Sequence, residues 1–147
     1  MITKRSVLLF IPYLVALAVL LFAAWTVWLT YLNPIPATET LLETLGAWFD
    51  RLSPVLIGLI FWLPGVLVLA FSHHLRRAVY MFVFCQAMCL TLITGVLSEL
   101  GYPWAHILYW VILVWTGPVT VQGILALLAP AAPPKSAFLL RVVYGTA

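Results

Sequence analysis

The chain has 147 residues, of which 65% are hydrophobic and only 7% are charged, and its formal net charge is +3. Soluble domains carry about 25% charged residues, so this composition excludes a water-soluble domain and predicts one integral membrane domain. The few basic residues are spread over turns, which does not indicate nucleic-acid binding. Cys85 and Cys89 lie inside one apolar run, where we expect them to be packing residues rather than a disulfide framework.

The first apolar run predicts a membrane-spanning helix over about 7–32. Lys4 and Arg5 precede it and an aromatic cluster ends it, as in a helix that enters from the cytoplasm and places its aromatic residues at the far interface. A cleaved signal peptide is the alternative, but the run is longer than the roughly 7–15 apolar residues of a signal peptide. Asn33 and Pro34 then end the helix.

The next stretch, about 40–52, is amphipathic. Thr40 and Glu43 have the spacing of a capping box, which starts a helix. Apolar residues recur at helical spacing on one face, namely Leu41, Leu42, Leu45, Trp48, Phe49 and Leu52. This pattern predicts a helix that lies on the outer membrane surface or docks on a protein. Its polar face leans acidic, which disfavours attraction to anionic lipid.

Three further apolar runs predict membrane-spanning helices over about 54–71, 78–98 and 105–128, followed by a cytoplasmic tail, 131–147. Each run is close to the roughly 20 residues that a helix needs to cross a bilayer. The second span contains Pro64-Gly65 and the fourth contains Gly117-Pro118. At Pro64, neighbouring helices or ordered water must satisfy the carbonyl group that loses its donor.

The distribution of charge predicts the orientation. Arg76 and Arg77 lie in the short turn between the second and third spans, and they place this turn in the cytoplasm. In this orientation Arg51 is the one basic residue of seven that lies outside, together with all four acidic residues. The sequence therefore predicts an all-α, multi-pass protein of the bacterial cytoplasmic (inner) membrane. It would have four transmembrane helices, both termini in the cytoplasm and one amphipathic interfacial helix outside.

Three histidines are the candidate binding residues. His73 and His74 are expected at the inner interface, and His106 just inside the outer interface. A bis-histidine haem needs two imidazoles at one depth, and the opposite ends of a span about 30 Å thick cannot supply them. One histidine alone suits a chlorophyll-type magnesium, a quinone or a lipid headgroup at a subunit interface. The alternative is that all three are polar residues at helix ends, and no cofactor of its own or metal site is expected.

The polar residues expected within the spans are few: Gln86, Gln122, Thr91, Thr94 and Thr120. In lipid such side chains form hydrogen bonds across helix interfaces, or they line a ligand site near the Gly117-Pro118 break. A proton- or cation-coupled transporter uses an acid or a base within the membrane. The expected spans contain neither, which disfavours that class.

Four motifs lie between residues 53 and 130: Phe61-Trp62-Leu63-Pro64-Gly65, His73-His74-Leu75-Arg76-Arg77, Leu100-Gly101-Tyr102-Pro103-Trp104-Ala105 and Trp115-Thr116-Gly117-Pro118-Val119. With them, this stretch resembles the membrane regions of bacterial multi-helix sensor proteins. In those, one helix and an external segment precede a Phe-Trp helix, a basic turn and a further helical pair. The resemblance implies a sensor's membrane platform. Because the chain ends at Ala147, no signalling domain is expected.

No arrangement of residues typical of an enzyme is found, so the chain is expected to be no enzyme. The sequence favours a non-catalytic accessory or structural subunit that packs against larger integral membrane subunits and membrane lipids. The expected host is a bioenergetic complex, either a quinol-oxidising electron-transfer complex or a photosynthetic one. The alternative is a membrane sensor or small-ligand-binding module that acts through a separate signalling partner.

Overall fold

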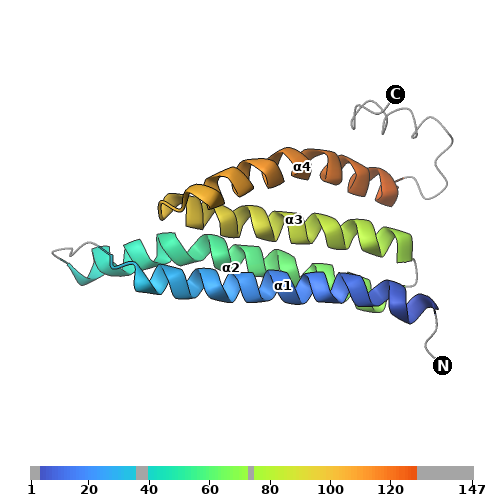
Figure 1. Ribbon diagram of the computed structural model, residues 1–147, viewed down its shortest axis with the longest axis horizontal. Coiled ribbons are helices and arrows are strands. Elements are labelled where there is room, and N and C mark those ends of the chain that lie inside the picture. Colours follow the sequence, from blue (N-terminus) through green and yellow to red (C-terminus); the bar gives the residue numbers. More distant parts are fainter. Residues whose placement is uncertain (1–3, 36–39, 73–74, 129–147) are drawn as a thin grey trace.

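The described part of the chain folds into four long α-helices (Figure 1). The structure is a computed structural model that describes residues 4–35, 40–72 and 75–128. The helices are α1 (Lys4–Leu32), α2 (Leu41–Phe71), α3 (Leu75–Glu99) and α4 (Pro103–Leu128). The predicted all-helical class is confirmed, and all four helices are long and apolar enough to cross a membrane, as expected of a multi-pass membrane protein. The tail 131–147 lies outside the described residues.

The expected break between a surface helix and the second span is absent. Residues 41–71 form the one continuous helix α2, so the prediction of two separate helices over 40–52 and 54–71 is wrong. The capping box at Thr40 and Glu43 is present and starts α2. Pro54 lies inside the helix and removes the donor for the carbonyl of Asp50. Asp50 is exposed, so water or a headgroup can satisfy this carbonyl and the helix continues.

Consecutive helices run in opposite directions, which gives the molecule two different ends (Figure 1). One end, here called the basic end, holds the start of α1 and the α2–α3 connection, with Lys4, Arg5, Arg76 and Arg77. The other, here called the aromatic end, holds the end of α1, the start of α2 and the α3–α4 turn. At the aromatic end, α2 projects beyond the other helices (Figure 1).

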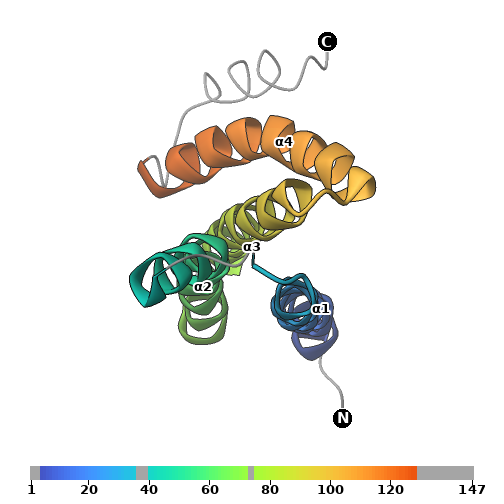
Figure 2. The same cartoon turned by 90° about the vertical axis from the view of Figure 1, so that its left-hand side faces the viewer.

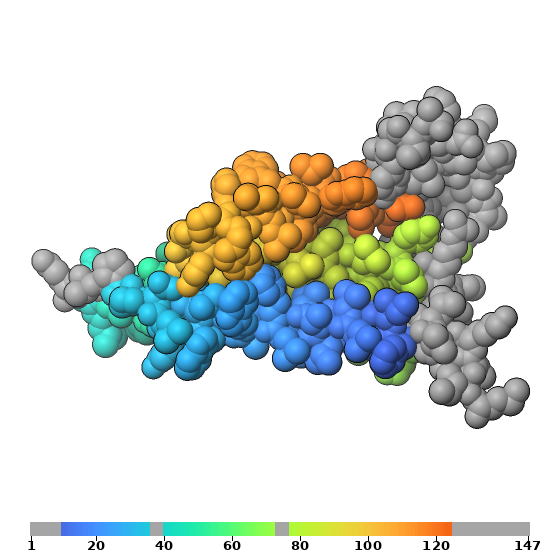
Figure 3. All heavy atoms as spheres, in the orientation of Figure 1, coloured from blue at the N-terminus to red at the C-terminus, as the bar shows by residue number. Residues whose placement is uncertain are grey.

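The central helix is α3. It packs against α1, α2 and α4, whereas along its length α4 packs on α3 alone among the described helices. Seen from the aromatic end, α4 lies on one side of α3, and α1 and α2 lie on the other (Figure 2). The surface of α3 shows between α1 and α4 (Figure 3). In the apolar stretch of α3 50% of the residues are buried, against 11% in α4, so α4 is the least covered helix.

The closest packing in the fold is between α2 and α3. Gly58 and Gly65, seven residues apart on one face of α2, lie against Cys89 and Cys85 of α3. A Cβ atom on Gly65 would lie 2.7 Å from the Cβ atom of Cys85, and one on Gly58 would lie 3.3 Å from the carbonyl oxygen of Cys89. Small residues allow helices in lipid to approach and gain van der Waals contact. Both cysteines are buried, which confirms that they are packing residues.

Helix α1 is attached to this pair by apolar packing and one hydrogen bond. Two buried clusters join the helices: Val19, Ala23, Val55, Cys89, Ile93 and Val96 form one, and Ala16, Leu69, Ala78 and Phe82 form the other. Trp62 of α2 packs against both clusters. Its indole N–H donates to the carbonyl oxygen of Ala16 in α1 at 2.8 Å. The indole thus fills the space between α1 and α2 without leaving an unpaired donor.

We predict that Gly65→Ala lowers the stability of the protein more than Gly58→Ala does. Overpacking of a well-packed core costs about 1–3 kcal/mol, and the added methyl group at Gly65 requires the larger displacement. The measurement is the midpoint of thermal unfolding in detergent, followed by circular dichroism.

The matched control is Gly46→Ala, because nothing lies within 4 Å of its Cβ position. This variant is expected to be as stable as the wild type or slightly more stable, since alanine favours helix. Equal stability of all three variants would contradict the close α2–α3 contact.

Candidate functional site

The α3–α4 turn fixes the geometry of the aromatic end. Gly101 has φ 86°, a left-handed conformation that glycine adopts without steric cost. The N–H of Tyr102 donates to the carbonyl of Leu97, and the N–H of Gly101 donates to that of Ser98. These two bonds form a Schellman motif, which satisfies the last carbonyl groups of α3. Pro103 then begins α4, at a position where a missing N–H is tolerated.

Aromatic rings join α1 to this turn. Trp25 of α1 stacks on Trp104 of α4, with ring centroids 5.7 Å apart and an interplanar angle of 17°. Phe22 contacts both of these rings, and Tyr102 contacts Trp104. Aromatic pairs of this kind add about 0.5–1.5 kcal/mol each beyond their buried area. The first turn of α4 is therefore held against α1, although the rest of α4 is not.

Asn33 connects three elements at the same end. Its side-chain Nδ2 donates to the carbonyl of Leu29 at 2.8 Å and to the hydroxyl of Tyr102 at 3.2 Å. Its own carbonyl accepts a hydrogen bond from Nη1 of Arg51 in α2 at 3.0 Å. Trp48 of α2 also contacts Tyr31 of α1. The end of α1, the α3–α4 turn and α2 at Arg51 therefore lie at one level.

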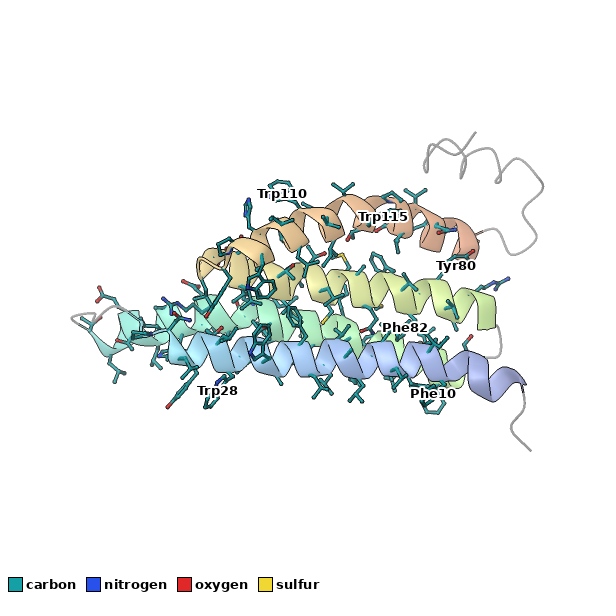
Figure 4. All side chains as sticks on the ribbon, viewed as in Figure 1. Phe10, Trp28, Tyr80, Phe82, Trp110 and Trp115 are labelled. Carbon is teal, nitrogen blue, oxygen red and sulfur yellow. The ribbon has the colours of Figure 1, made fainter. Side chains whose placement is uncertain are left out.

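His106 lies in the first part of α4, and both of its ring nitrogens have partners within the chain. The indole N–H of Trp110 donates to Nε2 at 3.1 Å, and Nδ1 lies 2.9 Å from the hydroxyl oxygen of Ser98. An indole N–H can only donate, so Nε2 accepts and the proton of the neutral ring is on Nδ1. Nδ1–H then donates to Ser98. Trp110 points away from the other helices (Figure 4).

This geometry bears on the expected binding role of the histidines. A magnesium pigment needs a ring nitrogen with a free lone pair, and in His106 that lone pair accepts the bond from Trp110. A ligand at His106 would therefore have to displace Trp110. His73 and His74 lie outside the described residues. Among the described residues no group of three or more histidine, cysteine or acidic side chains is placed to hold a metal ion.

The threonines within the spans bond mostly to their own helix. Thr94 donates to the carbonyl of Leu90, and Thr120 donates to that of Thr116. Thr91 of α3 and Thr116 of α4 have hydroxyl oxygens 3.4 Å apart, which is a polar contact between two helices. The expectation of bonds across helix interfaces is met at this pair, whereas the other threonine bonds return to the preceding turn.

Gln86 is the exception among these polar residues. Its side chain is 3% exposed and lies against α2, where its Nε2 would be 3.1 Å from a Cβ atom on Gly65. Neither its Nε2 nor its Oε1 has a hydrogen-bond partner. A buried amide without partners is costly, above all in lipid, where no bulk water can replace them. Among the described residues, Gln86 is therefore the one buried side chain whose polar atoms lack a hydrogen-bond partner.

No protein-family model, curated protein or solved structure matches this chain. The site therefore has to be read from its own geometry. Sequence reasoning did not identify the hydrogen bonds of Asn33, Trp62 and Trp110. The sequence contains one indication of the Trp110 bond, because Trp110 follows His106 by four residues and so shares its helix face. The partners of Asn33 and Trp62 lie on other helices, and sequence spacing does not reveal them.

We predict that Gln86→Met raises the midpoint of thermal unfolding of the purified chain. Methionine has a similar length and flexible shape, and it removes an unpaired amide whose burial costs about 1–3 kcal/mol. The control is Gln86→Glu, which places a carboxyl group at the same site and is expected to lower the midpoint. A lower midpoint for Gln86→Met would show that the amide has a bonding partner in the protein.

We also predict that His106→Ala removes the acceptor of the Trp110 indole N–H. The indole N–H resonance of Trp110 is expected to shift in this variant, because the hydrogen bond to Nε2 is lost, and solution NMR in detergent measures it. The resonance of Trp104, whose ring stacks on Trp25, is the internal control and should not move. An unchanged Trp110 resonance in His106→Ala would contradict the bond.

Proposed function

We propose that this chain is a non-catalytic accessory subunit that packs against larger integral membrane subunits of a complex. The observation that carries the proposal is the uncovered face of α4. Beyond its first turn, α4 packs on α3 alone among the described helices, and Val114, at mid-helix, is 70% exposed. Pro118 has no N–H, so the carbonyl of Val114 lacks its helical donor.

A carbonyl without its donor is costly where lipid surrounds it. In membrane proteins such groups are re-satisfied by neighbouring helices, by Ser or Thr side chains, by water or by local changes of the helix. No described helix of this chain covers the face of α4 that carries Val114. A donor from a helix of another subunit satisfies this carbonyl and buries the surrounding apolar face at the same time.

Helix α2 also has an exposed apolar residue whose carbonyl lacks its helical donor. Pro64 removes the donor for the carbonyl of Ile60 in α2, and Ile60 is 67% exposed. Helix α2 lies on the far side of α3 from α4 (Figure 2). Two uncovered faces with interrupted helices suit a small subunit that is inserted between larger ones.

The proposed orientation places the basic end in the cytoplasm of a bacterium, with the N-terminus inside. Its support is the charge distribution: the basic end carries Lys4, Arg5, Arg76 and Arg77, whereas Glu43, Asp50 and Glu99 are at the aromatic end. Lys and Arg near the ends of spans resist translocation. The aromatic end would then face the outside of the inner membrane.

The proposed host is a bioenergetic complex, of the quinol-oxidising or photosynthetic kind. The support is compositional: 14% of the residues are aromatic, and Trp28, Trp110 and Trp115 are exposed on the helices. Exposed rings of this kind suit contact with protein, lipid or pigment held by a partner. Because both nitrogens of His106 are engaged, we assign any such cofactor to the partner subunits.

One observation favours the alternative, a membrane sensor or small-ligand-binding module. The buried amide of Gln86 has a donor and an acceptor without partners, next to the interruption of α2 at Pro64. A ligand with complementary polar groups would satisfy both. We rank this function second, because Gly65 and Cys85 fill the space beside the amide.

We predict that Val114→Trp removes the chain from its complex. The indole ring is larger than the valine side chain. It is stable in contact with lipid, but it prevents the close approach of a partner helix at this face. The measurement is a native gel of membranes solubilised in mild detergent, with immunodetection of the chain, which should shift from a large band to a small one.

The matched control is Leu21→Trp, at an exposed apolar position on α1. It should leave the large band unchanged. A large band that survives Val114→Trp would contradict a partner on α4, and a small band in the wild type would contradict the accessory function as a whole.

A further inference from the structure

The first part of α2 extends past the rest of the molecule. Arg51 bonds to Asn33 at the end of α1, so residues 41–50, here called the α2 extension, project beyond the aromatic end (Figure 1). At 1.5 Å per residue the extension is about 15 Å long. The interfacial region on each side of a bilayer is roughly 5–8 Å thick, so the extension reaches beyond it.

The extension presents an apolar strip that no described residue covers. Leu41, Leu42, Leu45 and Phe49 share one side of the helix, and each has more than half of its side-chain surface exposed. Within the spans, exposed apolar residues face lipid. In the orientation proposed above, the extension begins at the aromatic rings, where Trp48 contacts Tyr31, and runs outward from them. The same exposure then places large apolar side chains in an aqueous environment, which is unfavourable.

The polar side of the extension is acidic. Glu43 and Asp50, seven residues apart, lie in one line beside the apolar strip. Arg51, the next residue, donates to the carbonyl of Asn33. The extension therefore offers an apolar strip beside two acidic side chains.

We propose that the α2 extension is the docking site for a basic amphipathic segment of a different subunit, outside the membrane. Apolar side chains of that segment cover Leu42, Leu45 and Phe49, and its Lys or Arg side chains lie opposite Glu43 and Asp50. The inference rests on the proposed accessory function and adds the chemistry of the partner.

Two other occupants fit less well. A second copy of this chain in the same orientation would bring its own Glu43 and Asp50 to this site. Apart from Arg51, which donates to Asn33, the basic residues of its described part lie at the opposite end. A membrane surface would require the extension to bend, yet α2 is continuous through Pro54. An acidic segment is also repelled by anionic lipid.

The test is the accessibility of a thiol at Leu45→Cys in the full chain. Cys85 and Cys89 are buried, so a membrane-impermeant maleimide should react only with the new thiol. Reaction rates are compared in open fragments of native membranes and in nanodiscs that hold the purified chain in lipid from the same membranes. We expect labelling to be several-fold slower in the native membranes.

Removal of the negative charge tests the proposed chemistry. Adding E43Q and D50N to Leu45→Cys should restore faster labelling in native membranes, and a glutamine at position 43 keeps the capping box of α2. The matched control adds E99Q, which neutralises an exposed acidic residue at the same end but outside the extension, and it should leave labelling slow.

The other outcomes overturn the inference. Slow labelling in both preparations means that lipid covers the extension, and fast labelling in both means that nothing docks there. A native gel of the same membranes separates the two proposals. A large band together with fast labelling retains the accessory function and rejects this docking site, whereas a small band rejects both.

Discussion

The close approach of α2 and α3 determines how the rest of the protein is arranged. Helices in lipid gain no hydrophobic free energy from association. Their association depends instead on van der Waals contact, which requires the two backbones to approach closely. Gly58 and Gly65 allow this approach against the two cysteines of α3. With α2 fixed there, Trp62 reaches the carbonyl of Ala16 and attaches α1. The remaining side of α3 is left for α4.

A second constraint is that lipid supplies no partner for a polar group. Most threonine hydroxyls therefore donate to a carbonyl of their own helix, and the indole N–H of Trp62 donates to a carbonyl of another helix. Pro64 of α2 and Pro118 of α4 have the opposite effect, because each removes the donor for the carbonyl of an exposed residue, Ile60 or Val114. The surfaces around these residues and the α2 extension are apolar and exposed, so the two proposals share one physical basis. No described residue covers these surfaces, and a larger assembly would cover them.

Much of the fold could be predicted from the sequence, because membrane spans depend on length and apolar composition. The Schellman turn at Gly101 lies between the spans expected over about 78–98 and 105–128. The break at Ser53-Pro54 was wrongly expected, since the cost of an internal proline depends on whether Asp50 is exposed, and exposure is a property of the fold. The partners of His106 and Asn33 depend on how the helices are packed, which apolar patterns in lipid do not specify.

The most direct test of the account is the mass of the particle that contains this chain in native membranes. Native mass spectrometry after extraction in mild detergent provides it, with dissociation in the gas phase to identify the released subunits. We predict a particle far heavier than the 16.4 kDa of the chain, which releases this chain together with larger integral membrane subunits. A particle that holds only this chain and lipid would contradict the proposed accessory function.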